Sequence, residues 1–196
     1  MIELVYPAEP APLLPKPTYK NPGIVNLAGE EIIPVVDQSA MVIGRTARSW
    51  AHGGTFLLHP SVHLHFIDRK GRLLLQKRSK NKKFLPGLWD SAVGGHVSYG
   101  ESIQAALHRE AFEELGKVDF NPTFLVKYLW ESQREKELAF VFAAIGSLSE
   151  DISNEEVEQV KYFTFPQIDS MREQGVLTPD LSYELGLIKD KLLALL

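Results

Sequence analysis

Short apolar runs alternate along the chain with clusters of turn-forming residues, and this pattern predicts β-strands joined by tight turns. The segment Asp68-Arg69-Lys70-Gly71, between two such runs, is typical of a hairpin turn. An acidic loop is predicted over residues 150–158. The predicted strands cover residues 32–37, 41–44, 61–67, 72–78, 90–95, 123–130, 138–144 and 160–165.

Three other segments have helical features. Residues 102–115 place apolar side chains three and four positions apart, as on one face of a helix. A short helix is predicted over residues 166–174. A last helix is predicted to begin at Thr178, which would cap it, with Pro179 in the first helical position, and to end near Leu195. Because helices and strands are interleaved, the fold class is α/β or α+β with a mixed sheet.

The first 30 residues differ from the rest, because they contain six prolines and predict an extended arm with little regular structure. Its apolar residues Val5, Leu13 and Leu14 would dock on the core or on a second subunit. The second arrangement would be a homodimer. Residues 31–196 would then form one domain of ordinary size.

The composition of the chain indicates which kinds of partner it would bind. The formal net charge is −4, so no overall positive field attracts nucleic acid or an anionic membrane. The chain has no cysteine, which excludes disulfides, thiolate metal sites and a cysteine nucleophile. We find no secretory signal and no apolar run of the ~18–20 residues that span a bilayer, so we expect a cytoplasmic protein that acts on a small molecule.

The predicted helix over residues 102–115 carries an unusual group of carboxylates. Glu110, Glu113 and Glu114 share one helix face, where like charges repel one another. A bound divalent cation would offset that repulsion, and carboxylate oxygens select magnesium or manganese. Glycines before the helix, such as Gly95, would let backbone carbonyls approach the metal.

The spacing of these residues resembles the Nudix box, G-x5-E-x7-R-E-U-x-E-E-x-G-U, in which U is a bulky aliphatic residue. The two departures are Ala111, which is small, and Lys117, which is charged, and both concern packing rather than chemistry. Every fixed position of the box is present, namely Gly95, Glu101, Arg109, Glu110, Glu113, Glu114 and Gly116.

The resemblance to the Nudix hydrolase superfamily implies an α/β/α sandwich around a mixed β-sheet. It implies that Glu113 and Glu114 hold Mg2+ or Mn2+, that Glu110 is a further ligand or orients the attacking water, and that the Gly95 carbonyl completes the site. Glu101 and Arg109 would have structural roles. The implied reaction is hydrolysis of a phosphoanhydride bond in a nucleoside diphosphate linked to another group, or in a similar organic diphosphate.

A second resemblance is to the Nudix branch that contains isopentenyl-diphosphate isomerase. It rests on Lys77-Arg78-Ser79, Pro86-Gly87-Leu88-Trp89-Asp90 and Gly94-Gly95-His96. Those isomerases bind a metal through three histidines and two glutamates, and the matching positions are His52, His59, His96, Glu135 and Glu137.

Two observations weigh against carrying the isomerase chemistry over. The isomerases have a cysteine directly before the Gly-His pair, where this chain has Gly94. Histidines in strands are also more often structural than metal-binding, and His63 and His65 share one face of a predicted strand. An isomerase-like enzyme and a non-catalytic nucleotide-binding Nudix module therefore stand as alternatives to the hydrolase.

Positive charge is concentrated in and after the strand over residues 72–78. Arg78, Lys82 and Lys83 are predicted to bind substrate phosphate there, although a solvated loop would carry the same charges. In the acidic loop, Glu155 and Glu156 are candidates for a catalytic base.

Overall fold

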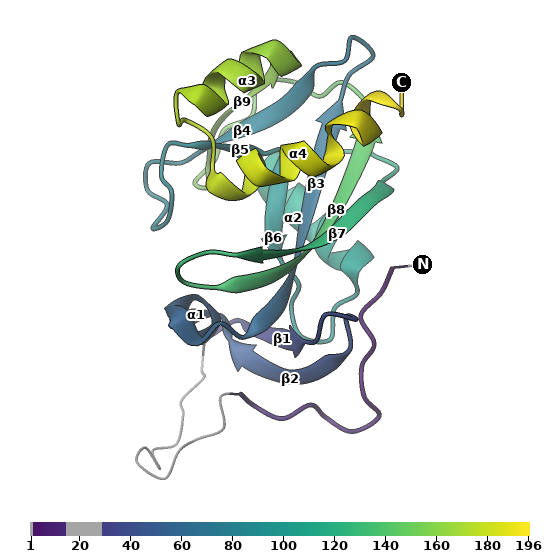
Figure 1. Cartoon of the computed structure of the whole chain (residues 1–196), viewed down its shortest axis with the longest axis vertical. Helices are drawn as coiled ribbons and strands as arrows, with labels where there is room; N and C mark the ends of the chain where they lie inside the picture. Colours follow the sequence, from purple (N-terminus) through teal and green to yellow (C-terminus); the bar gives the residue numbers. More distant parts are fainter. Residues whose placement is uncertain (1, 15–28) are drawn as a thin grey trace. The chain divides into compact units, whose positions relative to one another are not determined.

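The computed structural model describes residues 2–14 and 29–196, so the part of the predicted arm over residues 15–28 lies outside the described chain. The chain forms two compact units. The first comprises Met1–Ser61, His96–Ala106 and Lys127–Phe140, and the second comprises Val62–Gly95, Leu107–Val126 and Val141–Leu196. The elements, drawn in Figure 1, are β1 Ile32–Val36, β2 Val42–Ala47, α1 Arg48–Trp50, the π-helix η1 Ala51–Thr55, β3 Leu58–Ile67, β4 Leu73–Arg78, β5 Trp89–Ser91, β6 Val93–His96, α2 Ile103–Leu115, β7 Thr123–Glu131, β8 Lys136–Ile145, β9 Val157–Phe163, α3 Phe165–Glu173 and α4 Pro179–Leu193.

In the first unit, β1 and β2 pair antiparallel as a two-stranded sheet, with a bulge between Val35 and Val36. This confirms the two short strands expected around a turn. The N-terminal residues run beside β2, where isolated parallel bridges join Val5 to Met41 and Leu13 to Arg45. The described part of the arm therefore docks on its own chain.

The helical segment formed by α1 and η1 follows β2 directly and was not predicted. Gly53 and Gly54 lie inside it with non-helical dihedral angles, and Phe56 ends it in the left-handed conformation. The two glycines weakened any helical signal in the sequence. The segment carries His52.

The larger sheet has the strand order β5-β4-β3-β8-β7, with β6 paired to β3 and β9 paired to β4. All the predicted strands are present, and the predicted segment over residues 90–95 is divided between β5 and β6. The last strand begins earlier than expected, at Val157, because the end of the predicted acidic loop pairs with β4. Buried apolar side chains of these strands, such as Leu64, Phe66, Leu73 and Leu75, form much of the core.

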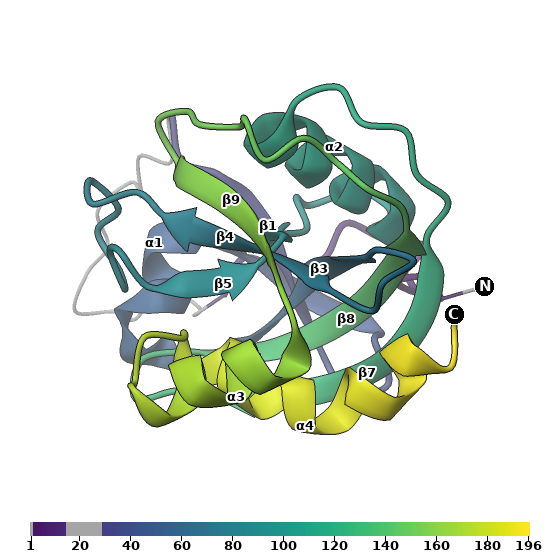
Figure 2. The same cartoon turned by 90° about the horizontal axis from the view of Figure 1, so that it is seen from above.

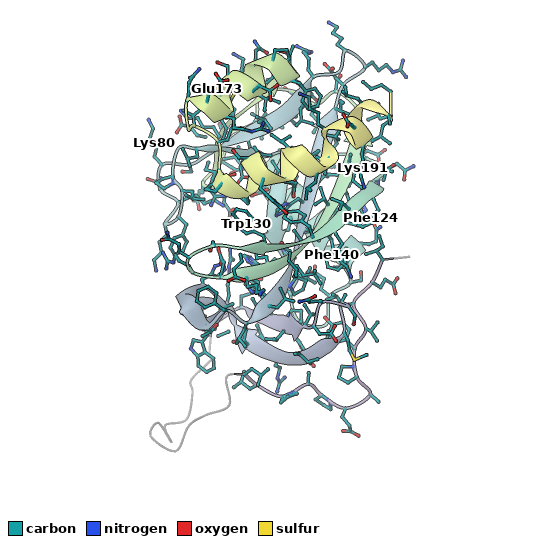
Figure 3. The ribbon with its side chains drawn as sticks, in the orientation of Figure 1. Lys80, Phe124, Trp130, Phe140, Glu173 and Lys191 are labelled. Atoms are coloured by element: carbon teal, nitrogen blue, oxygen red, sulfur yellow. The ribbon has the colours of Figure 1, made fainter. Side chains whose placement is uncertain are left out.

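Helices cover both faces of the sheet in the second unit: Figure 2 shows α2 on one side of the strands and α3 and α4 on the other. This arrangement confirms the α/β class. Helix α3 begins with a capping box in which Thr164 and Gln167 satisfy each other's backbone. Lys191 of α4, labelled in Figure 3, donates to the Leu125 carbonyl at 2.8 Å.

One predicted cap is wrong in its detail. Thr178 is the N-cap residue of α4 and Pro179 follows it, as expected, but the Thr178 side chain makes no capping hydrogen bond. Its hydroxyl lies 3.1 Å from Asp90 Oδ1, to which it donates instead. The described residues contain no helix that is long and apolar enough to cross a membrane.

Candidate functional site

Glu114 is the buried carboxylate of α2, with only 2% of its surface exposed. Its Oε2 accepts a hydrogen bond of 2.9 Å from the Gly94 backbone N–H and one of 3.0 Å from the Gln76 side-chain amide. Gly94 lies in β6 and Gln76 in β4, so two strands fix the orientation of this side chain. Gln76 was not predicted, although a polar residue that interrupts the apolar run Leu73-Leu74-Leu75 was a signal that could have identified it.

Burial raises the pKa of Glu114 from 4.5 to about 8. The hydrogen bond from Gly94, the charge of Lys82 and the hydrogen bond from Gln76 lower this pKa, while the nearby Glu110 raises it. The protein thus holds a carboxyl group in a place where its charge is costly without a counter-ion. A divalent cation would supply that counter-ion, and a carboxylate oxygen is a ligand that Mg2+ prefers.

Gly95 is required for the position of Glu110. A Cβ atom built on Gly95 would collide with the Glu110 carboxylate, so that carboxylate lies directly against the backbone of β6. The Glu110 side chain is 12% exposed, and the Glu113 side chain, one helical turn further on, is 49% exposed. The three carboxylates expected to bind metal therefore differ in exposure, because Glu114 is buried and Glu113 faces solvent.

Arg109 bridges two of the helix carboxylates. Its Nη1 lies 2.7 Å from Glu110 Oε1 and 3.2 Å from Glu113 Oε2. The guanidinium therefore neutralises part of the charge that crowds this face of α2. Glu101, which the box resemblance makes structural, accepts a 3.1 Å hydrogen bond from the Ser98 backbone N–H in the loop before α2.

Arg78, expected to bind substrate phosphate, is engaged inside the second unit. Its Nη1 lies 2.8 Å from Asp90 Oδ2, and its Nη2 donates to the Phe84 carbonyl at 3.2 Å. These contacts tie β4 to β5 and to the following loop, and phosphate binding by Arg78 stays a prediction.

Lys82 is better placed than Arg78 to act on a ligand. Its ammonium group lies 2.7 Å from Glu156 Oε2, and its charge lowers the pKa of Glu114. Lys83 is exposed, with its Nζ 5.7 Å from the centre of the Phe84 ring. Glu156 and its neighbour Glu155 are both exposed in the loop before β9.

The loop before β9 is attached to the end of α2 by Asn154, which was not predicted. Its side-chain amide donates to the Glu114 carbonyl at 2.9 Å, while its Oδ1 accepts from the Val157 N–H at 2.9 Å. The carbonyls at the end of a helix lack partners within the helix, and Asn154 supplies one.

A separate cluster of histidines and glutamates lies in the first unit. The rings of His52, His59 and His96 have centroids 4.8 to 5.7 Å apart. Their ligand atoms all lie within 4.8 Å of one another, and the same holds for His59, Glu135 and Glu137. These are the five residues that the isomerase resemblance selected. His52 lies in η1, His59 in β3 and His96 in β6, whereas Glu135 directly precedes β8 and Glu137 lies at its start.

His59 has the features of a metal ligand. Its Nδ1 lies 2.8 Å from the Leu57 carbonyl, to which it donates, and this leaves Nε2 as the acceptor. That Nε2 is buried, with no hydrogen-bond partner among the described residues. Burial lowers the pKa of His59, an effect that the Leu57 carbonyl partly offsets, so the imidazole is held in the neutral form that binds metals.

The two glutamates of this cluster are also held in place. Burial would raise the pKa of Glu135, but its hydrogen bond and ion pair with His52 bring that pKa below its ordinary value. Glu137 accepts a 2.9 Å hydrogen bond from the Ser61 hydroxyl and lies 3.8 Å from His96 Nε2. Three imidazoles and two carboxylates form a donor set that suits a divalent transition metal.

Two further histidines, His63 and His65, share a buried carboxylate. His63 Nδ1 lies 2.6 Å from one carboxylate oxygen of Glu184, and His65 Nε2 lies 2.5 Å from the other. All three residues are buried. Burial would raise the pKa of Glu184, but the two imidazoles hold it well below its ordinary value. This network fastens α4 to β3.

Comparison with known proteins shows the family of the chain. The family model described as the NUDIX domain matches residues 57–182. An uncharacterized Nudix hydrolase of Listeria monocytogenes is 31% identical over 124 residues, which is 62% of this chain and 73% of that protein. An isopentenyl-diphosphate Delta-isomerase of Streptomyces coelicolor is 36% identical over 101 residues, and the match spans 51% of each chain, about half of the isomerase.

A solved structure gives the same architecture. The crystal structure of a Deinococcus radiodurans protein superposes with a TM-score of 0.68 at 20% sequence identity, covering 79% of this chain and 97% of that one. At this identity the likeness concerns the fold alone, and it agrees with the α/β sandwich expected from the box.

Proposed function

The chain belongs to the Nudix family, and from this premise we propose that it is a divalent-metal-dependent hydrolase of a phosphoanhydride bond. Its substrate would be a nucleoside diphosphate linked to another group, or a similar organic diphosphate. The observation that carries the proposal is the buried Glu114, whose raised pKa calls for a counter-ion, beside the carboxylate of Glu110.

The donor set fits Mg2+ or Mn2+, because Glu110, Glu113 and Glu114 offer hard oxygen ligands and the Gly95 carbonyl is a further one. When bound, the metal would withdraw charge from a phosphate and lower the pKa of a water molecule. The chain's own residues do the positioning. Gly94 and Gln76 orient Glu114 through their amides, and Gly95 leaves room for Glu110.

A substrate phosphate would compete with Glu156 for the ammonium group of Lys82. Each oxygen of the phosphate is an acceptor at least as strong as the exposed carboxylate that holds Lys82 in this structure. Glu156 would then be released close to the reacting group, where it is a candidate for the base that takes a proton from the attacking water. The proposed substrate is a small molecule, so the proposed function involves no nucleic acid or membrane partner.

The test is turnover of a panel of capped diphosphates with Mg2+ and then Mn2+, measured as released phosphate or nucleotide. Glu114→Gln keeps the shape of the side chain and removes its charge. We expect it to lower turnover by at least ~100-fold, about 2.7 kcal/mol of barrier. The matched control is Glu173→Gln, at the exposed end of α3, labelled in Figure 3. Equal activity of the two variants would refute the role of Glu114, and no turnover of any substrate by a folded, metal-binding protein would favour a nucleotide-binding module.

An isomerase-like activity is the second candidate, favoured by the histidine cluster. The thiol that the isomerases have is missing, since Gly94 stands at its position. A Cβ atom at Gly94 would meet Ser91 Oγ at 3.4 Å and His63 Cδ2 at 3.7 Å, which are ordinary contacts, so a cysteine fits there. Isomerisation of an isoprenoid diphosphate by the parent protein would establish this candidate. Its absence in both the parent and Gly94→Cys would exclude it.

A further inference from the structure

We propose that the N-terminal segment, residues 2–14, clamps the loop over residues 97–101, and that Tyr6 is the positioning residue through which it acts on His96. The inference rests on metal binding by the histidine cluster, which is the observation that favours the second candidate function. The segment and the loop both belong to the first unit, and the loop follows directly after His96.

The N-terminal segment is anchored along the edge of β2 by backbone hydrogen bonds at two places. Near its start, Val5 donates to the Ala40 carbonyl at 3.1 Å, and the Val5 carbonyl accepts from Val42 at 2.8 Å. Near its end, Leu14 donates to the Arg45 carbonyl at 2.8 Å, and Arg45 donates back to the segment, also at 2.8 Å. The segment therefore has a fixed register on β2, although it forms no continuous strand.

Close packing supports the second anchor. A Cβ atom built on Gly44 would collide with the Leu14 side chain, so the absence of a side chain at Gly44 lets the segment lie flat on β2. Between the anchors, Ala11 is buried, with 2% of its surface exposed, as is Leu4 near the first anchor, with 8% exposed. A segment rich in proline thus gains a defined position from burial and backbone pairing rather than from regular structure.

Tyr6 lies between the first anchor and the loop. Its hydroxyl accepts a 2.9 Å hydrogen bond from the Gly100 N–H and lies 3.4 Å from the Glu101 carbonyl, to which it donates. Gly100 has a φ of +89°, so the loop turns at this point in a conformation that other residues rarely adopt. Burial raises the pKa of Tyr6, which keeps the phenol protonated and able to serve as donor and acceptor.

Tyr99 provides a second contact between the segment and the loop. Its ring packs edge-on against Tyr6, with centroids 5.6 Å apart, and its hydroxyl accepts from the Ala11 N–H at 3.1 Å. The Tyr99 N–H donates to the Ile32 carbonyl of β1 at 2.8 Å, and the guanidinium of Arg45 lies 5.5 Å from the ring centre. The loop is therefore held by hydrogen bonds to β1 and to the N-terminal segment.

This attachment matters because the loop fixes the chain on one side of His96. The His96 ring is buried against His52 and His59, and a metal there would need all three imidazoles within narrow limits of position. Loss of the Tyr6 hydroxyl would leave the Gly100 N–H without this acceptor and give the loop more freedom. The expected result is weaker metal binding at the histidine cluster with little loss of overall stability.

The experiment compares Tyr6→Phe, which removes only the hydroxyl, with Tyr183→Phe, which removes a hydroxyl from an exposed tyrosine on α4. Hydrogen exchange of the peptide over residues 97–101 is measured by mass spectrometry, and Co2+ affinity is measured by calorimetry. We expect faster loop exchange and about fivefold weaker Co2+ binding in Tyr6→Phe, which converts to about 1 kcal/mol, and no change in Tyr183→Phe.

A double-mutant cycle with His96→Ala separates positioning from general destabilisation. If Tyr6 acts through His96, Tyr6→Phe has no further effect on Co2+ affinity once His96 is removed. Additive effects would overturn the positioning role, and so would faster loop exchange with unchanged Co2+ affinity. Unchanged loop exchange would overturn the clamp itself. A parent protein that binds no Co2+ would instead refute the histidine metal site, and loop exchange alone would then decide whether the clamp exists.

Discussion

Replacing Gly95 with alanine tests the proposed metal site at its tightest point. The added Cβ would occupy the space of the Glu110 carboxylate, which is the end of a flexible side chain and can move away. The fold should therefore survive, with a change in unfolding free energy within about 1 kcal/mol. The displaced carboxylate, however, would no longer reach its place beside β6. A misplacement of about 1 Å at a catalytic group costs about 100-fold in rate, or about 2.7 kcal/mol of barrier.

The neighbouring glycine supplies the control. Gly94→Ala adds the same atom one residue earlier, where it meets only ordinary contacts, so activity and stability should remain close to those of the parent. The assay is kcat/KM on the best substrate of the diphosphate panel, together with thermal unfolding of each variant. If Gly95→Ala loses no more activity than Gly94→Ala, the Glu110 carboxylate has no catalytic position to lose, and the reasoning fails.

Three further predictions concern stability. The folded-state pKa of Glu114, about 8, lies above its ordinary value of 4.5, so the metal-free protein should lose stability as pH rises from about 5 to 8; Glu114→Gln should flatten this dependence in urea unfolding with a chelator present. Glu184 has a lowered pKa, so its stabilising effect is present above about pH 4.5 and is lost as the pH falls below that value. At pH 7, Glu184→Leu should lower the free energy of unfolding by about 3 kcal/mol, because two buried histidines lose their hydrogen-bond acceptor. The control Glu173→Leu should change it by less than about 0.5 kcal/mol. Thr164→Ala should remove the capping box of α3 and cost about 1 kcal/mol in the same unfolding assay.

The elements with a strong local signal were predictable. Helix α2 has apolar residues at helical spacing, and the hairpin formed by β3 and β4 has turn residues between two apolar runs. The segment of α1 and η1 was not predictable, because Gly53 and Gly54 lie inside it and glycine disfavours a helix. The start of β9 at Val157 was missed for a related reason, since pairing with β4 determines it rather than local polarity.

The residues of the candidate site can also be separated into those that the sequence predicted and those that it did not. The carboxylates of α2 and the histidine cluster were selected from spacing and resemblance, and their roles stay predictions until the variants are measured. The supporting residues Asn154 and Ser61 have no local signal and could not be selected, because each acts on a partner at least 40 residues away in the chain. Gln76 has a signal, because it is polar and directly follows the apolar run Leu73-Leu74-Leu75, but its partner Glu114 lies 38 residues away. For Thr178 the sequence predicted the position of the helix cap correctly but not its hydrogen bond. The Thr178 hydroxyl donates to the carboxylate of Asp90, which is distant in the sequence.

The guanidinium of Arg109, held between Glu110 and Glu113, has a consequence for how the proposed metal would bind. This internal cation already relieves the repulsion between these two carboxylates, so they do not depend on a metal to remain together while the chain folds. The proposed metal would then bind reversibly to the folded protein and would not be required for folding. Such a protein can be emptied with a chelator and reloaded with a different ion while folded, and its activity would follow the supply of free divalent ions around it.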